Sequence, residues 1–103
     1  AAYAEPFVAG RPHHIRVFDV APDGTLTGGA VVVDIDDGVP DGLRLDGAGR
    51  IWTSAGDGVR CYGADGTLLL KVLLPEVASN LTIHDRTMYI TASTSVWRLE
   101  LGA

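Results

Sequence analysis

The sequence predicts an all-β protein made of antiparallel, four-stranded blades of a β-propeller, of which about two and a half are present. Three observations predict this architecture. Short runs of β-branched and aromatic residues recur along the chain, six Asp-Gly dipeptides separate most of them, and longer segments repeat at a spacing of roughly 37 to 44 residues. No run keeps an apolar stripe at helical spacing, so essentially no helix is expected.

The strands are expected in three groups along the chain. The first group is a hairpin around Pro22-Asp23-Gly24, because Asp-Gly between two strand-like runs favours a tight turn. The second group has further Asp-Gly dipeptides in its connections, at 46, 57 and 65. The expected strands are 15–20 and 26–35; then 43–46, 51–55, 59–62 and 67–74; and finally 81–84, 88–92 and 96–101.

Two internal repeats give these groups a common frame. "IRVFDVAPDGTL" (15–26) lines up with "VRCYGADGTL" (59–68), and "NLTIHDRTMYITASTSVWRL" (80–99) lines up with "GLRLDGAGRIWTSAGDGVRC" (42–61). In a propeller frame, residues 1–103 form one partial propeller. Its parts are the outer strands of one blade (15–35), a full blade (42–74) and the inner strands of a further blade (79–101). A nine-stranded antiparallel sandwich is the alternative, and it leaves the repeat unexplained.

Composition excludes several classes of protein. The chain has 103 residues, enough for one small domain, and 47% are hydrophobic, so a core is expected. The net charge of −5 argues against nucleic acid as a partner. No apolar stretch approaches the roughly 20 residues that span a bilayer, so no membrane partner is expected. The single cysteine, Cys61, mildly favours a reducing compartment, and we expect a cytoplasmic location.

Three longer segments resemble one known family. "HHIRVFDV", "GVPDGLRLDGAGRIWTSAGDGVRCYGADGTLLLKVLLPE" and "SNLTIHDRTMYITASTSVWRLEL" are similar to the C-terminal blades of the senescence marker protein/gluconolactonase (regucalcin-like) family. The resemblance runs from about residue 12 onward, and its motifs occur in the same order as in the family. It implies a six-bladed propeller that hydrolyses sugar lactones with one divalent metal, Ca²⁺, Mg²⁺, Mn²⁺ or Zn²⁺, in the central channel.

The resemblance also singles out one site residue. Family members hold the metal with an early Glu, a mid-chain Asn and the Asp of a Pro-Asp-Gly motif, and the last of these corresponds to Asp41. The positions of the other two ligands fall upstream of residue 1. The motif alone favours a simple turn at Asp41, whereas the resemblance favours a metal ligand that also serves as catalytic base.

Asn80 is the second candidate. It occupies the place in its blade that Gly42 occupies in the preceding one, at the channel end of the inner strand. A contact with substrate or with metal-bound water is one interpretation, and an internally satisfied hydrogen bond at the end of a loop is the other.

The other polar and aromatic residues are expected to be structural. Adjacent strand residues point to opposite faces, so His13 and His14 cannot share one ion. Cys61 is expected to be a buried small hydrophobe. Turn roles are expected for Asp23, Asp46, Asp57 and Asp65, a solvated loop for Asp36-Asp37, and packing between blades for Trp52, Tyr89 and Trp97.

Two functions from different classes follow from these observations. The first is a gluconolactonase-type hydrolase that opens an aldonolactone to the acid with help from the metal, with a sugar lactone as substrate. The second is a non-catalytic propeller fragment that acts as a binding module or self-associates through its open blade edges. A propeller sensor that binds a sugar or ion without turnover is a third possibility, because fold alone does not settle function.

Overall fold

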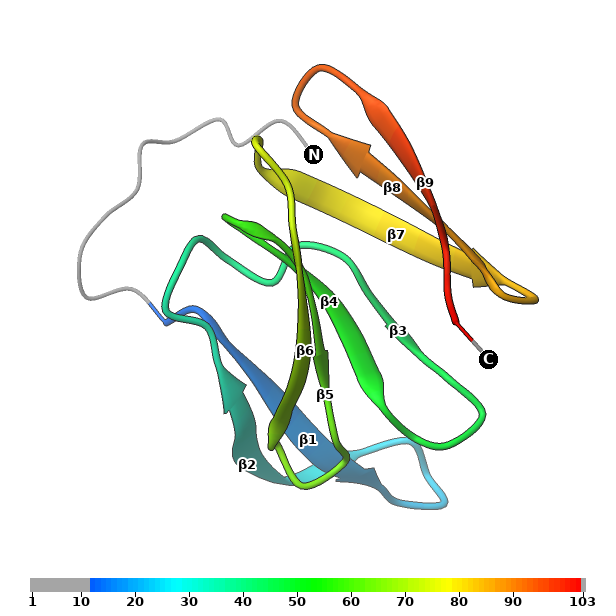
Figure 1. Ribbon diagram of the computed structural model, residues 1–103. Coiled ribbons are helices and arrows are strands. Elements are labelled where there is room, and N and C mark those ends of the chain that lie inside the picture. The colour runs from blue at the N-terminus through cyan, green and yellow to red at the C-terminus, as the bar shows by residue number, and fades with distance from the viewer. Residues whose placement is uncertain (1–11, 103) are drawn as a thin grey trace.

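The computed structural model describes residues 12–102, and nine strands and their turns make up the regular structure of that range (Figure 1). They form three antiparallel sheets of two, four and three strands. The predicted all-β class and the partial blades are therefore confirmed. Residues 1–11 and 103 of the predicted partial propeller lie outside the described residues. Within residues 12–102, no helix is long and apolar enough to cross a membrane.

The first sheet is a hairpin of β1 (His14–Val20) and β2 (Leu26–Asp34). Its turn contains Asp23, whose carboxylate accepts hydrogen bonds from the backbone N–H of Thr25 (3.0 Å) and from its hydroxyl (2.7 Å). The following Gly24 has a φ of 89°, in the left-handed region that glycine adopts without strain. The predicted turn role of Asp23 is therefore confirmed.

The second sheet contains four strands in the order in which they follow along the chain. Because every neighbouring pair is joined by a short turn, the sheet is a meander with β3 at one edge and β6 at the other. Its strands are β3 (Leu43–Leu45), β4 (Ile51–Ala55), β5 (Gly58–Tyr62) and β6 (Leu68–Leu73).

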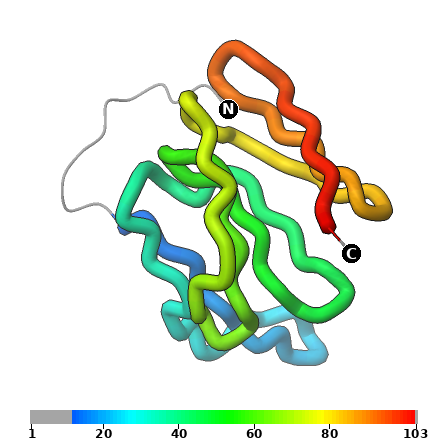
Figure 2. Tube along the Cα trace, in the orientation of Figure 1, coloured from blue at the N-terminus to red at the C-terminus, as the bar shows by residue number. Residues whose placement is uncertain are grey.

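The third sheet is also a meander, of β7 (Ala78–His84), β8 (Thr87–Ala92) and β9 (Val96–Glu100). The chain passes once through each sheet before it enters the next, as the colour sequence in Figure 2 shows. The first strands of the second and third sheets, β3 and β7, contact each other. This contact brings the starts of two neighbouring sheets together.

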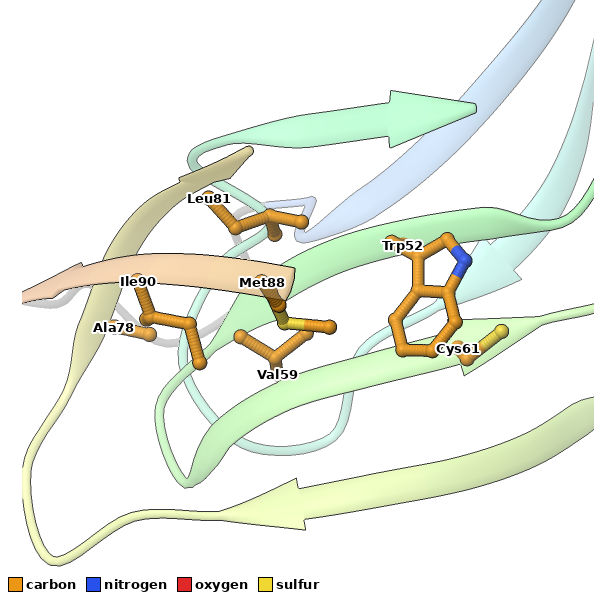
Figure 3. Packing of buried hydrophobic residues seen from close by; sticks show 7 residues of the cluster. All are labelled: Trp52, Val59, Cys61, Ala78, Leu81, Met88 and Ile90. Carbon is orange, nitrogen blue, oxygen red and sulfur yellow. The ribbon is translucent and has the colours of Figure 1, made fainter. Parts of the chain in front are cut away.

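The core consists of two hydrophobic clusters, one on each face of the second sheet. The larger cluster joins β4 and β5 to β7 and β8 of the third sheet, and Figure 3 shows its side chains. It contains Trp52, Val59, Cys61, Ala78, Leu81, Met88 and Ile90. The smaller cluster joins β4 and β5 to the end of β2, and it contains Val33, Ile35, Ile51, Ala55 and Tyr62.

Every residue of β4 and β5 is buried as a result. A sheet covered on both faces by separate neighbouring sheets is the arrangement of a propeller blade and differs from a two-sheet sandwich. Burial on both faces also explains why these two strands lack the polar alternation of a half-exposed strand.

The predicted packing role holds for two of the three aromatic residues. Trp52 lies in the larger cluster, and Trp97 packs against it while its indole N–H donates to Glu76 Oε2 at 3.1 Å. Tyr89 is 42% exposed, so it does not pack between these sheets. Its neighbours Met88 and Ile90 point into the cluster, and successive strand residues point to opposite faces.

Candidate functional site

Asp41 lies in the connection between the first and second sheets. Residues 36–42 leave the end of β2 and lead into β3, and the Asp41 side chain is exposed. The start of this connection rests on the β4–β5 hairpin, where the N–H of Gly56 donates to the carbonyl of Asp37 at 2.7 Å. A Cβ atom at Gly38 would come within 2.6 Å of Gly56 Cα, so glycine is required for this close approach.

Ser54 of β4 holds the other end of the connection. Its hydroxyl oxygen accepts hydrogen bonds from the backbone N–H groups of Asp41 (3.1 Å) and Gly42 (2.8 Å). The same hydroxyl donates to the carbonyl of Ser79 in β7 at 3.3 Å. The N–H of Ser54 donates to the carbonyl of Gly42 at 2.8 Å. The Asp41-Gly42 backbone is therefore tied both to its own sheet and, through Ser54, to the next one.

Asn80 of β7 packs directly against this segment. A Cβ atom at Gly42 would lie 2.7 Å from Asn80 Cα, so a side chain at position 42 does not fit. The structure therefore brings Asn80 beside the residue that follows Asp41. The Asn80 Oδ1 atom accepts the N–H of Leu81 at 2.8 Å, which is a satisfied hydrogen bond of the kind the structural interpretation expects. Asn80 is also exposed, and its contact with substrate stays a prediction.

A buried arginine that pairs with the start of the 36–42 connection was not predicted from the sequence. The side chain of Arg60 in β5 is 4% exposed, and its guanidinium contacts Asp36 Oδ1 at 2.7 Å and Asp57 Oδ2 at 3.1 Å. It also donates to the hydroxyl of Tyr62 at 3.4 Å. The sequence signal that could have indicated this ion pair is an arginine within an apolar strand, three residues after an aspartate.

These contacts set the charge state of the cluster. Burial acts to lower the pKa of Arg60, but its hydrogen bonds to Asp57, Tyr62 and Asp36 outweigh burial and raise that pKa, so the guanidinium stays charged. The hydrogen bond and charge of Arg60 lower the pKa of Asp36. Asp36 is exposed, as the predicted solvated loop requires, but it is also an ion-pair partner that fixes the start of the Asp41 connection. Asp57 is likewise both a turn residue and an ion-pair partner.

The remaining acidic turn residues have local partners. Asp65 accepts the N–H of Thr67 at 3.0 Å in the β5–β6 turn, as Asp23 does with Thr25 in the β1–β2 turn. Asp46 accepts the backbone N–H groups of Ala48 and Arg50, and its second oxygen accepts the Arg50 guanidinium (2.6 Å) and the Trp52 indole (3.0 Å). The carboxylate of Asp46 therefore links its turn to the larger core cluster.

The histidines and the cysteine also have structural surroundings. His13 hydrogen-bonds through Nδ1 to the carbonyl of Ile35, whereas His14 accepts a hydrogen bond from Arg16 at 3.0 Å. The two rings thus have separate partners. Cys61 is buried in the larger cluster, and burial raises the pKa of its thiol, as a packing role requires.

The donor set for a metal ion is incomplete in the described part of the chain. Among residues 12–102, no three His, Cys, Asp or Glu side chains are grouped so that they could hold an ion. The Asp41 carboxylate is a hard oxygen donor of the type that Ca²⁺, Mg²⁺ and Mn²⁺ prefer, with the amide side chain of Asn80 in the neighbouring strand. These two side chains carry hard oxygen donors, and they do not make up a ligand set for a divalent ion on their own.

The sequence and the fold are similar to known proteins. The family described as the SMP-30/gluconolactonase/LRE-like region matches residues 7–94. A gluconolactonase from Xanthomonas campestris has a similar structure, with a TM-score of 0.80 and 34% sequence identity, over 86% of this chain and 30% of that chain. A second protein, proposed to be a gluconolactonase, gives a TM-score of 0.81 and 37% identity, over 85% of this chain and 31% of that chain.

The computationally designed Ika4 protein is a more distant neighbour, with a TM-score of 0.55 and 19% identity over 84% of this chain and 61% of that chain. At that identity the likeness concerns the fold alone. No curated protein matches the sequence. The chain spans about 30% of the length of the two more similar structures.

Proposed function

Because this chain belongs to the SMP-30/gluconolactonase family, we propose that it carries part of the active site of a sugar-lactone hydrolase. The reaction is the opening of an aldonolactone by water. The oxygen of a water molecule adds to the carbonyl carbon, the ring C–O bond breaks, and the ring oxygen leaves as a hydroxyl after taking up a proton. The aldonic acid is the single product, because the leaving hydroxyl stays attached to the same molecule.

Asp41 is the residue to which we assign the chemistry. Its carboxylate accepts a proton from the attacking water and so acts as general base. The same carboxylate supplies one oxygen ligand to a divalent ion, Ca²⁺, Mg²⁺, Mn²⁺ or Zn²⁺. Such an ion, when bound, polarises the lactone carbonyl and lowers the pKa of bound water. Further ligands are needed to complete this site, since no three His, Cys, Asp or Glu side chains are grouped to hold an ion among residues 12–102.

One observation carries the assignment. The exposed Asp41 side chain lies two residues before β3, and the next residue packs against Asn80, near the start of β7. In a propeller the first strands of successive blades line the channel, so side chains at their starts face the space where a ligand binds. Asn80 is the residue that we propose to contact the lactone there, through its side-chain amide.

The test compares two copies of the same tripeptide in the intact protein. Hydrolysis of glucono-δ-lactone is followed by acid release for the wild type, with and without EDTA, and for Asp41→Ala and Asp23→Ala. We expect EDTA and Asp41→Ala each to reduce the rate at least a hundredfold, because both remove a group that acts on the reacting water. Asp23→Ala is the matched control and should retain the rate, since its carboxylate bonds only within its own turn. Equal rates with and without EDTA would contradict the metal-assisted reaction.

A second function is favoured by the exposed apolar side chains. Several large hydrophobic residues, distributed over all three sheets, are more than half exposed, among them Val17, Val20, Leu26, Leu69, Leu73 and Val96. Apolar surface of this kind marks a site of association, so a non-catalytic module that pairs with further copies or with a partner is the alternative. The same samples decide between the two: a wild-type protein without lactonase activity whose light-scattering mass exceeds one chain supports the module.

A further inference from the structure

The hydroxyl group of Ser54 occupies a position where all of its hydrogen-bonding capacity is used. A serine hydroxyl has one donor and two acceptor lone pairs. Here the oxygen accepts the N–H groups of Asp41 and Gly42, so its own hydrogen must point to the remaining partner, the carbonyl of Ser79. Ser54 is 0% exposed, so its hydroxyl is shielded from water in the folded chain.

Ser54 and Arg60 fix opposite ends of the connection that carries Asp41. At the upstream end, the Asp36–Arg60 ion pair and the Gly56–Asp37 backbone hydrogen bond hold the chain on the β4–β5 hairpin. At the downstream end, the Ser54 hydroxyl is the side-chain group that holds the backbone of Asp41. The position of the Asp41 carboxylate depends on the Asp41 backbone, because only two side-chain torsions lie between them.

The same hydroxyl also sets the distance between sheets at this point. Gly42 is bound by Ser54 and packs against Asn80, while Ser79, the neighbour of Asn80, accepts the hydrogen bond of Ser54. Ser54 therefore joins the residue next to Asp41 to the residue next to Asn80.

We propose that Ser54 is a positioning residue that holds Asp41 and Asn80 in a fixed relation across two neighbouring sheets. Its hydroxyl acts through the backbone of Asp41 and Gly42 and touches no reacting atom. The consequence for catalysis rests on the proposed function, whereas the positioning itself does not. Loss of the Ser54 hydroxyl should therefore change the protection of the Asp41 and Gly42 backbone amides, whether or not the chain is an active lactonase.

Amide hydrogen exchange, measured by NMR on the intact protein, tests the positioning directly. In Ser54→Ala the N–H groups of Asp41 and Gly42 lose their acceptor, and we expect their exchange to accelerate about tenfold or more, as the loss of one buried hydrogen bond predicts. The N–H of Leu81, which bonds to Asn80, should keep its rate. Unchanged exchange at Asp41 and Gly42 would overturn the proposal.

Two further comparisons separate positioning from general loosening. Ser54→Thr and Ser54→Val add nearly the same volume, but only threonine retains a hydroxyl, so threonine should protect the two amides and valine should not. If both variants behave alike, the hydroxyl is not responsible. Ser79→Ala is a matched control, because its hydroxyl bonds to Thr91 and its removal leaves the Ser79 carbonyl in place. It should leave the exchange at Asp41 and Gly42 unchanged.

Kinetics then link the positioning to the reaction. Where the wild type hydrolyses glucono-δ-lactone, Ser54→Ala should lower kcat about tenfold or more with a smaller change in KM, and Ser54→Thr should restore kcat. Fast exchange in Ser54→Ala together with an inactive wild type would refute the proposed function and leave the positioning intact. The opposite result is an active wild type, loss of that activity in Asp41→Ala, and unchanged amide exchange in Ser54→Ala. It would support the proposed function and refute the positioning role of Ser54.

Discussion

Asp46 is a single carboxylate that joins a turn to the core. Its oxygens receive four hydrogen bonds, two from backbone N–H groups and two from the side chains of Arg50 and Trp52. Burial acts to raise the pKa of Asp46, but the hydrogen bonds from Trp52, Arg50 and Ala48 prevail and lower it from 3.8 to about 2. The ionised form is therefore the one that the folded structure binds.

This shift predicts a pH-dependent stability. Because the folded-state pKa lies below the unfolded one, the contribution of Asp46 is complete above about pH 4 and is lost as the pH falls toward 2. We expect Asp46→Asn to lower the free energy of unfolding by about 2 kcal/mol at pH 7 and by much less near pH 2. Urea unfolding at several pH values measures both differences.

Asp65→Asn serves as the control for that experiment. Asp65 also accepts a backbone N–H in a hairpin turn, but its carboxylate has no indole or guanidinium partner in the contacts described above. Because its carboxylate is exposed, its substitution should cost less at pH 7 than Asp46→Asn does, although hydrogen bonds from Thr67 also lower the pKa of Asp65. A constant difference between wild type and Asp46→Asn from pH 7 to pH 2 would show that the hydrogen bonds do not depend on ionisation.

Single residues were predictable where their partners are local. The two Pro-Asp-Gly copies illustrate this: Asp23 bonds to Thr25 two residues away, so the repeat was enough to assign its turn. Arg60 was missed because one of its partners, Asp36, lies in a connection that only the folded chain brings to it. The role of Ser54 was missed for the same reason, since its partners Asp41 and Ser79 lie far from it in the sequence, in the connection before β3 and in β7.

At the scale of elements, the connection 36–42 is shaped by close backbone contacts. Gly42 is required because of the space at its position, as the Asn80 backbone fills the place of a side chain there. The Asp-Gly motif alone predicts an ordinary turn at its neighbour Asp41, whereas the resemblance predicts a metal ligand there. The structure instead uses the glycine to let two sheets approach each other beside the candidate site.

A glycine-to-alanine pair tests this reading of the connection. Gly42→Ala places a Cβ atom 2.7 Å from Asn80 Cα, so the sheets must separate, and we expect a loss of about 1–3 kcal/mol in the free energy of unfolding. Gly47→Ala adds the same methyl group where nothing lies within 4 Å, and it should change stability by less than about 0.5 kcal/mol. Urea unfolding measures the free energy of unfolding of both variants. Equal values for Gly42→Ala and Gly47→Ala would contradict the close approach of Gly42 to Asn80.

Most strands were predictable because turns and apolar runs alternate so regularly in the sequence. The start of β7 was the largest difference: the strand begins at Ala78, three residues before the expected run at 81. Its first residues include the polar Ser79 and Asn80, and the register shifts there, so Ala78 pairs with Ala92 and Asn80 with Thr91. A polar segment with a bulge gives no apolar pattern, although it pairs as a strand.

For the whole molecule, stability depends on how the three sheets pack together. Met88 is 0% exposed and lies in the cluster between the second and third sheets (Figure 3). We expect Met88→Ala to cost about 2–4 kcal/mol, because it removes buried surface and leaves a cavity. Leu73→Ala is the control: Leu73 is 69% exposed, so its truncation should cost under about 1 kcal/mol. Thermal unfolding followed by circular dichroism measures both.

The complete active site could not be predicted at this scale. A propeller channel is lined by residues from many blades, and the resemblance already implied that two metal ligands fall outside this sequence. What the fold adds is the direct contact between Gly42 and Asn80, which the repeat had placed only at equivalent positions of successive blades.

The second sheet has two unlike faces, one fitted to β2 of the preceding sheet and the other to β7 and β8 of the following sheet. Identical units of this kind join head to tail, because neither face is complementary to itself, and a two-fold symmetric pair does not use them. Any assembly that repeats this head-to-tail contact has a polarity, and it stops growing only when the last unit contacts the first and closes a ring. Ring closure is then a geometric property of the packing angle, and it is independent of the chemistry at Asp41.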